Sequence, residues 1–201
     1  MLGPRGAHIK IIAKIENQEG LNNYDEILAA ADGIMVARRD LGMEIEPEKV
    51  FIAQKWMIEK ANVAAKPVIT AFQMLESMVS NIRPTRAEAS DVANAVLDGT
   101  DAVTLSRESS HGMYPIETVT IMSKICMEAE RCYNYKRQYN DIRFFTQFPV
   151  STAEAIALSA VGTVNELHID LIIVITDTGN ICRLVSKYRP QVPIFACCVS
   201  N

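Results

Sequence analysis

The sequence lacks the features that mark several classes of protein. Its 201 residues carry a net charge of −4 and contain neither a basic cluster nor an acidic tail, so nothing favours nucleic acid as a partner. The longest apolar runs, such as residues 171–175, are far shorter than the ~20 residues that cross a bilayer. The first residues do not resemble a signal peptide. We therefore expect a soluble, cytoplasmic protein with no membrane partner.

The cysteines lack the spacing of a metal or redox site. None of the five cysteines belongs to a C-x-x-C pair or has a nearby histidine at zinc-ligand spacing. We expect reduced, mostly buried thiols of a cytosolic protein. These cysteines are Cys126, Cys132, Cys182, Cys197 and Cys198.

What the sequence does contain is a repeated alternation of strand and helix patterns. Hydrophobic residues make up 49%, enough for a sizeable core. Four short apolar runs are each followed by apolar residues at helical spacing, which predicts four βα units and an α/β fold with a parallel sheet. The predicted strands span residues 9–17, 33–37, 67–71 and 102–105. The first run is rich in isoleucine and predicts a strand buried on both faces.

A polar, tyrosine-rich segment at residues 132–150 interrupts this alternation. Interleaved basic and aromatic residues are typical of some RNA-binding segments, but acidic and amide residues are mixed in here. We therefore interpret the segment as a connection, either a solvated linker or a packed arm. Residues 151–201 then predict two helices and two strands, few for an independent domain. The sequence thus divides into residues 1–131, a connecting segment 132–150, and residues 151–201.

Charged residues follow the first two predicted strands where a functional site is expected. Lys14 and Glu16 are two positions apart, so they face the same side of the strand, and Asp40 follows the next strand. Functional groups of parallel α/β folds gather at the C-terminal ends of strands. Glu16 and Asp40 could jointly hold Mg²⁺, with Lys14 placed to neutralise a phosphoryl or enolate oxygen. The alternative is a network of structural ion pairs.

Four long segments resemble pyruvate kinase, in the order and at the spacing of that family. They read I-I-A-K-I-E-N-Q-E-G-L, D-G-I-M-V-A-R-x-D-L-G, K-P-V-I-x-A-x-Q-M-L-E-S-M and R-P-T-R-A-E-x-S-D-V-A-N-A-V-L-D-G. The resemblance extends from about residue 2 to the end. It implies that residues 1–131 form the second half of a catalytic (β/α)₈ TIM barrel. It also implies that residues 151–201 form a partial α/β C-terminal domain.

The resemblance implies a glycolytic phosphotransferase that converts phosphoenolpyruvate and ADP to pyruvate and ATP. Lys14 corresponds to the lysine that stabilises the transferring phosphoryl group, and Glu16 and Asp40 to the ligands of Mg²⁺ or Mn²⁺. The family also uses K⁺, whose site lies in the half of the barrel that this sequence does not contain. Implied partners are the substrates and nucleotides, together with homo-oligomers or full-length family protomers.

Three substitutions depart from the family pattern at the substrate side of the site. Arg39 stands for the glycine of R-G-D-L-G, Phe72 for the threonine of A-T-Q-M-L-E, and Arg107 for the glycine of L-S-G-E. If the first glycine needs a positive φ, arginine there costs ~1–2 kcal/mol. Phenylalanine offers no hydrogen bond to the substrate and is expected to crowd the pocket.

The C-terminal block departs from the family as well. Effector-sensitive members carry T-x-[ST]-G-[RK]-[ST], a loop that wraps a sugar phosphate. Thr176, Thr178 and Gly179 persist here, but Asn180 and Ile181 remove a cation and a hydroxyl. The sequence therefore predicts that the effector site is degraded.

These departures predict a chain that is inactive by itself. The first hypothesis is a truncated pyruvate kinase that contributes the lysine and metal ligands, and the second is a non-catalytic relative acting as a binding or regulatory subunit. A third, a lyase of the related phosphoenolpyruvate/pyruvate barrels, is disfavoured by the long family segments. Because half a barrel exposes two sheet edges, we also expect self-association or marginal stability.

Overall fold

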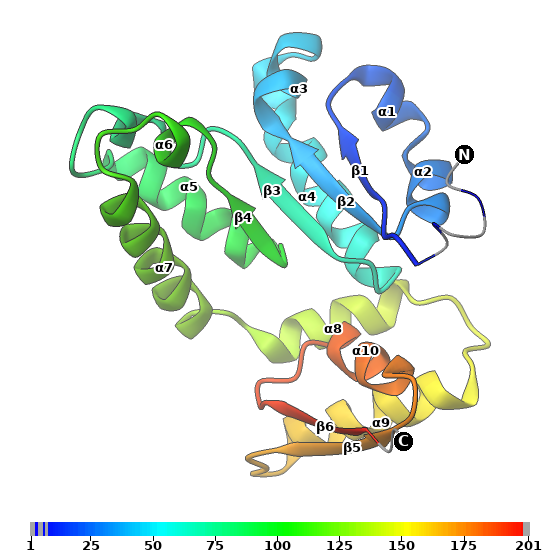
Figure 1. The fold of residues 1–201 in the computed structure, drawn as a ribbon. Helices are drawn as coiled ribbons and strands as arrows, with labels where there is room; N and C mark the ends of the chain where they lie inside the picture. Colours follow the sequence, from blue (N-terminus) through cyan, green and yellow to red (C-terminus); the bar gives the residue numbers. More distant parts are fainter. Residues whose placement is uncertain (1–2, 4–5, 7, 199–201) are drawn as a thin grey trace. The chain divides into compact units, whose positions relative to one another are not determined.

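The computed structural model describes residues 3, 6 and 8–198, which form two compact units divided between Tyr133 and Asn134 (Figure 1). We call the part before this division unit 1 and the part after it unit 2. Each unit is described by itself.

Unit 1 contains a four-stranded parallel sheet in the order β1-β2-β3-β4, so each strand pairs with the next one along the chain. The prediction of an α/β fold with a parallel sheet is confirmed. The strands are β1 (Ile12–Ile15), β2 (Gly33–Ala37), β3 (Val68–Ala71) and β4 (Ala102–Thr104).

Helices connect the strands of unit 1, and local sequence signals set several of their starts. Pro47 opens α4 at a position where no backbone N–H is needed. Thr85 and Glu88 form a reciprocal capping box that starts α5. The helices are α1 (Gln18–Asn22), α2 (Tyr24–Ala30), α3 (Arg38–Glu44), α4 (Pro47–Val63), the 3₁₀ turn η2 (Glu76–Val79), α5 (Arg86–Leu97), α6 (Arg107–Ser110) and α7 (Pro115–Arg131).

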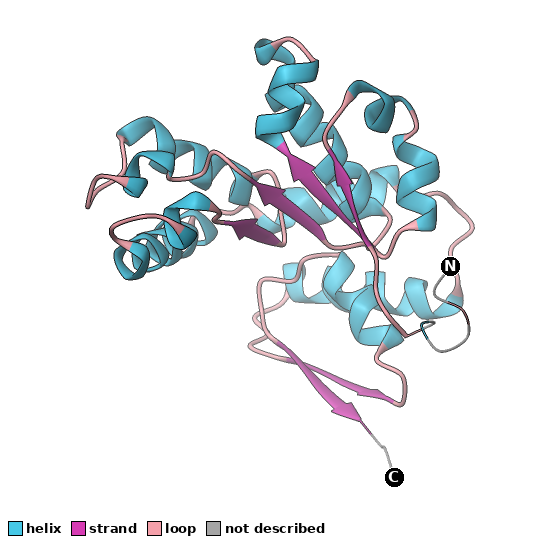
Figure 2. Ribbon diagram, turned by 45° about the horizontal axis from the view of Figure 1, so that its top comes forward, coloured by secondary structure: helices cyan, strands magenta, loops and turns pink. Residues whose placement is uncertain are grey.

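One face of the sheet packs against helices, as Figure 2 shows for the layers of unit 1. Ile34 and Val36 of β2 are fully buried, whereas Met35 between them is half-buried, in keeping with the two-residue period of a strand. They pack with Leu28 of α2 and Met57 of α4. A second cluster lies among η2, α5 and α7.

The first strand is shorter and more exposed than predicted. Residues 9–17 were expected to be buried on both faces, but β1 covers Ile12–Ile15 and only Ile15 of this strand is buried. Ile9 and Ile11 are about half exposed. Among the described strands, β1 pairs with β2 alone, so its other edge has no strand to cover it.

The segment after β3 is less helical than its sequence suggests. Residues 73–78 predict a helix, but only the four-residue turn η2 forms. Met74, Leu75 and Met78 are fully buried, so packing rather than helical hydrogen bonding fixes this segment. The backbone N–H of Ser77 accordingly donates to the side chain of Glu88, at 2.7 Å.

Unit 2 contains a two-stranded parallel sheet with helices and its own core. The pairing of its strands aligns Ile172 with Ile194 and Val174 with Ala196. The elements are α8 (Tyr135–Phe145), α9 (Thr152–Glu166), β5 (Ile172–Thr176), α10 (Asn180–Lys187) and β6 (Ile194–Cys198).

The segment predicted as a connection contains helix α8. The Asn134 side chain caps this helix by accepting a hydrogen bond from the N–H of Arg137, at 2.9 Å. Tyr139 and Ile142 are buried in the core of unit 2. The tyrosine hydroxyl donates to the carbonyl of Leu158 at 3.1 Å, which allows a polar-looking sequence to bury one face.

The cysteines are free thiols, but the prediction that most are buried is wrong. Cys132 and Cys198 are exposed, and the other three are half-buried. Within the residues that the structure describes, none of the helices has the length and apolar character needed to span a bilayer.

Candidate functional site

The three charged residues predicted to share a site lie together in unit 1. Lys14 belongs to β1, Glu16 follows it, and Asp40 lies in the first turn of α3, directly after β2. The Lys14 ammonium donates to Asp40 Oδ2 at 2.8 Å and also contacts the carboxylate of Glu16. The ends of two adjacent parallel strands therefore bring these side chains together.

Hydrogen bonds within this group shift two pKa values in opposite directions. Donation to Asp40, and then to Glu16, raises the pKa of Lys14 above its ordinary value. The hydrogen bond from Lys14, assisted by Arg39, lowers the pKa of Asp40. Lys14 and Asp40 are thus both charged at neutral pH.

The two carboxylates fit a divalent cation in type and number. Mg²⁺ in phosphoryl-transfer sites is usually held by one or two carboxylates, and substrate oxygens and waters complete its shell. The side chains of Glu16 and Asp40 are 45% and 26% exposed, so solvent reaches both. Across the described residues, no group of three or more His, Cys, Asp or Glu side chains could hold a metal by itself. These residues therefore suit a metal that a phosphorylated substrate helps to hold.

Arg39 lies beside the carboxylates without backbone strain. It adopts helical backbone angles in α3, so the positive φ considered for the family's glycine does not arise. Its Nε donates to Asp40 Oδ1 at 3.4 Å, and its guanidinium carbon lies 5.1 Å from the centroid of the Phe72 ring. The arginine therefore changes the charge and the space of the site rather than its backbone.

Phe72, directly after β3, carries the strain instead. It has φ +69° and Gln73 has φ +53°, both in the left-handed region that non-glycine residues rarely adopt. The Phe72 ring contacts two cations, with Lys14 Nζ 5.4 Å and Arg39 5.1 Å from its centroid. Positions 39 and 72, two of the three predicted to depart from the family pattern, are therefore in contact. We call Lys14, Glu16, Arg39, Asp40 and the Phe72 ring the Lys14 cluster.

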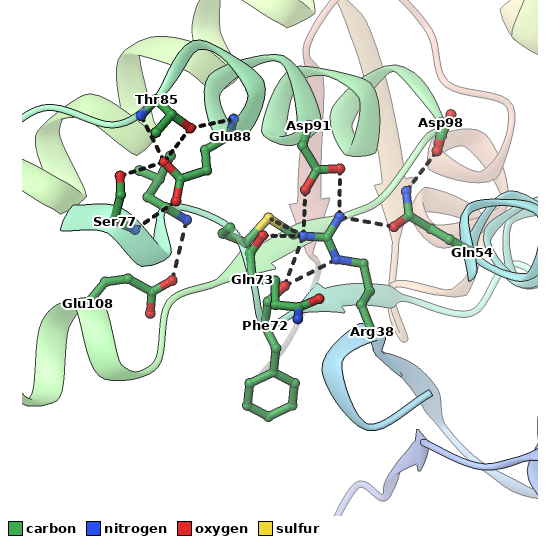
Figure 3. A network of polar contacts seen from close by, with 12 residues as sticks. Arg38, Gln54, Phe72, Gln73, Ser77, Thr85, Glu88, Asp91, Asp98 and Glu108 are labelled. Carbon is green, nitrogen blue, oxygen red and sulfur yellow. Dashed lines mark hydrogen bonds and ion pairs between the residues drawn. The ribbon is translucent and has the colours of Figure 1, made fainter. Parts of the chain in front are cut away.

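A buried arginine that the sequence reasoning missed holds this strained backbone in place (Figure 3). Arg38 donates to the carbonyl of Phe72 at 2.9 and 3.1 Å and to that of Gln73 at 2.7 Å. It also pairs with Asp91 at 2.7 Å and donates to Gln54 at 3.4 Å. Figure 3 shows the Phe72 ring pointing away from the guanidinium that holds its carbonyl. We call these contacts the Arg38 network.

A sequence signal for Arg38 exists but is weak. A charged residue that directly follows a buried strand needs partners, since an unpaired buried charge is costly. Neither the carbonyl groups nor Asp91 could be identified as those partners, because they lie 34 or more positions away.

Residues of α6, after β4, contact the loop of residues 72–76 after β3 from another side, because the N–H of Leu75 donates to Glu108 at 3.4 Å. Glu108 is almost fully buried, and its carboxylate accepts from the backbone N–H of Ser106 at 2.8 Å. Arg107 remains exposed and lies 3.4 Å from Glu76. Glu108 therefore stabilises the loop, whereas Arg107 adds a cation at its surface.

A cavity of about 710 Å³ opens next to the Lys14 cluster, among α3, α4 and α5. Arg38, Arg39 and Gln73 contribute to its wall, but of the described residues that line it none is Lys14, Glu16 or Asp40. We place the site at the carboxylates and the lysine because those groups can carry out the chemistry, and cavity size alone cannot.

The predicted effector-loop residues lie together at the start of α10 in unit 2. Gly179 precedes this helix with φ +76°, and its N–H donates to the Thr176 hydroxyl at 3.0 Å. The N–H of Asn180 donates to the Thr178 hydroxyl at 3.4 Å. Both hydroxyls therefore support the helix start, and the expected degradation of an effector site stays a prediction.

Comparison with known proteins identifies the family. The family described as pyruvate kinase, barrel domain, matches residues 1–119, and the one described as pyruvate kinase, alpha/beta domain, matches residues 154–201. The chain belongs to the pyruvate kinase family. The predicted resemblance is confirmed, and so is the fold class. The sheet of unit 1 is part of the family's barrel, and part of the α/β domain follows it.

Several pyruvate kinases are similar to the whole chain. It is 58% identical over 201 residues to a pyruvate kinase of Eimeria tenella, of which it covers 38%. It is 54% identical to a cytosolic pyruvate kinase isozyme of Glycine max, with 98% of the chain and 38% of the relative covered. A crystal structure of a pyruvate kinase from Cryptosporidium parvum matches with a TM-score of 0.91 at 57% identity, covering 96% of the chain and 39% of that structure. The chain thus spans about two fifths of the length of these relatives.

Proposed function

We propose that this chain forms the lysine and metal side of a pyruvate-kinase-type site, where a phosphoryl group passes between phosphoenolpyruvate and ADP to give pyruvate and ATP. The observation that carries the proposal is the convergence of Lys14, Glu16 and Asp40 at adjacent strand ends. Membership of the family supports it. The cytosolic isozymes among the relatives also support a cytosolic location.

Lys14 is proposed to stabilise the phosphoryl group during transfer. Catalysis of phosphoryl transfer depends mainly on positioning and on neutralising charge at the phosphoryl oxygens. The ammonium of Lys14 is positively charged at neutral pH and is held at the strand end by Asp40, at 2.8 Å. Glu16 and Asp40 would hold Mg²⁺ or Mn²⁺, which supplies further positive charge at those oxygens when bound.

We further propose that the 201-residue chain does not catalyse the reaction by itself. Phe72 supplies no hydrogen-bond donor where the family's threonine is expected to contact the substrate. Its ring contacts both Lys14 and Arg39, so it occupies space beside the lysine. Losing one such substrate contact lowers rates by about 10²–10³ in comparable sites.

A second candidate function is that of a non-catalytic subunit that binds another copy or a full-length family protomer. The contact between Arg39 and Phe72 favours it, because the two substituted side chains support each other within the substrate side of the site. In this case the partial barrel would serve for assembly, and the Lys14 cluster would not turn over substrate.

The experiment measures ATP formation from phosphoenolpyruvate and ADP. The chain is assayed alone and after completion with the N-terminal part of the Eimeria tenella relative, with and without Arg39→Gly, Phe72→Thr and Arg107→Gly. We expect no ATP from the chain alone and metal-dependent ATP from the completed triple variant. Adding Lys14→Met should lower kcat by about 10²–10³. Adding Lys49→Met, at an exposed lysine paired with Glu46, should have little effect.

The outcomes separate the two candidates. Strong, metal-dependent activity of the chain alone would contradict its proposed inactivity. If the completed triple variant stays inactive yet the original chain co-purifies with a full-length relative, the binding function is supported and the catalytic one is contradicted.

A further inference from the structure

The side chains of the protein itself already engage both carboxylate oxygens of Asp40. Lys14 Nζ donates to Oδ2 at 2.8 Å, and Arg39 Nε donates to Oδ1 at 3.4 Å. A metal ligand must offer a lone pair in the direction of the ion, so each of these donors competes with a cation for Asp40. Lys14 also contacts Glu16.

The charges of the cluster balance without a metal. Lys14 and Arg39 are positive, while Glu16 and Asp40 are negative. Sites for divalent cations derive much of their affinity from uncompensated carboxylate charge. Because the guanidinium does not lose its proton in proteins, Arg39 supplies this compensating charge at every working pH.

Phe72 keeps Arg39 close to Asp40. The arginine side chain is 47% exposed, and an exposed ion pair alone would hold it only weakly. The Phe72 ring adds a cation–π contact at 5.1 Å. The ring itself is positioned by the buried Arg38 network, which fixes the Phe72 backbone. Contacts with Asp40 and the Phe72 ring therefore hold the guanidinium of Arg39 beside the carboxylate.

We propose that Arg39 is a built-in cation that competes with Mg²⁺ or Mn²⁺ for Asp40, and that Phe72 strengthens this competition by holding the guanidinium in place. The inference rests on the proposed function, because it takes Glu16 and Asp40 as the metal ligands. It assigns Arg39 a role in setting metal affinity, separate from any effect of its size on substrate binding.

The test is direct Mn²⁺ binding to the 201-residue chain, followed by the electron paramagnetic resonance signal of free Mn²⁺. Arg39→Gln removes the charge but keeps a side chain suited to a helix. We expect this variant to bind Mn²⁺ about tenfold more tightly, as a unit charge beside a liganding carboxylate should matter on that scale. Arg39→Lys keeps the charge and should stay within about twofold of the original chain. The control is Arg137→Gln in unit 2, where an exposed arginine lies 3.6 Å from Asp141, and it should change nothing.

Two further variants tie the effect to the proposed contacts. Phe72→Leu removes the ring and should tighten Mn²⁺ binding about threefold. In a chain that already carries Arg39→Gln, it should add little. Asp40→Asn, added to Arg39→Gln, should abolish the gain.

The inference is overturned if Arg39→Gln binds Mn²⁺ no more tightly than the original chain, including the case where neither binds measurably. A gain that survives Asp40→Asn would also overturn it, because the metal would then lie elsewhere. These binding measurements need no turnover, so a completed chain that fails to make ATP would contradict the proposed catalysis without deciding this result.

Discussion

Two neighbouring arginines at the start of α3 belong to very different surroundings. Arg38 is 6% exposed, and its network gives every nitrogen of the guanidinium a partner within unit 1. Arg39, one residue later, is 47% exposed and shares Asp40 with Lys14. The first arginine organises the backbone of the site, whereas the second adjusts its charge.

This contrast suggests how the exposed side of the proposed site could vary while its buried frame is kept. Positions 39 and 72, two of the three predicted to depart from the family pattern, contribute their side chains to the exposed Lys14 cluster. From position 72, the Arg38 network uses only the backbone carbonyl, which any residue there would provide. A different side chain at position 72 could therefore change the Lys14 cluster without disturbing the hydrogen bonds of the Arg38 network.

The largest effect is expected when the Arg38 network is broken. Arg38→Met should lower the free energy of unfolding of unit 1 by about 3 kcal/mol, because it leaves the partly buried carbonyl oxygens of Phe72 and Gln73 and the carboxylate of Asp91 without their donor. The single tryptophan, Trp56, lies in α4 of unit 1, so its fluorescence during urea unfolding reports on this unit.

Arg39→Met is the matched control for this comparison. An exposed ion pair and one cation–π contact are together expected to contribute less than about 1 kcal/mol. If the two substitutions lower the free energy of unfolding equally, the buried Arg38 network contributes no more stability than the exposed contacts of Arg39.

A smaller gain in stability is expected from Gln73→Gly. Gln73 has φ +53° and an exposed side chain, so glycine should relieve strain and raise the free energy of unfolding by about 0.5–1 kcal/mol. Glu59→Gly, at an exposed position inside helix α4, should instead lower it by a similar amount. If both substitutions destabilise unit 1 alike, the backbone at position 73 is not strained.

The smallest effect is expected at the Lys14 cluster and depends on pH. Asp40→Asn should lower the free energy of unfolding by less than about 1 kcal/mol at pH 7, because the ion pair between Lys14 and Asp40 is exposed to solvent. The Asp40 pKa is lowered by Lys14, so the stability that this carboxylate adds is present above its unfolded pKa of about 3.9. That contribution disappears as the pH falls through the lowered folded pKa.

Urea unfolding of the original chain and of Asp40→Asn at pH 7 and near pH 2.5 tests this sign. The difference in free energy of unfolding between the two chains should be present at pH 7 and shrink in acid. A difference that grows in acid would mean that the Asp40 pKa is raised rather than lowered.

The sequence predicts the Lys14 cluster better than it predicts the Arg38 network. Lys14 and Glu16 follow from the two-residue period of a strand, and Asp40 from the rule that parallel strands present their C-terminal ends together. The left-handed backbone at Phe72 could not be predicted, because it depends on donors from Arg38, 34 positions earlier.

Helix α8 was missed for a related reason. Its sequence is polar overall, and only its packing shows that Tyr139 and Ile142 belong to a core. The tyrosine can be buried because its hydroxyl reaches the carbonyl of Leu158, a partner that local composition does not reveal. Periodic patterns thus locate elements well, whereas hydrogen bonds between distant segments decide how polar residues are used.

The order of the strands in unit 1 determines which of them unfold locally most easily. Among the described strands, β2 and β3 have a neighbour on each side, while β1 and β4 have one each. Local opening requires fewer broken contacts at the outer strands than at the inner ones. In deuterated water, amide protons of Ile34 and Val36 should therefore exchange late, and those of the outer strands early. The lysine of the proposed site thus lies on a strand expected to exchange early, whereas Asp40 lies in the helix that follows a strand expected to exchange late.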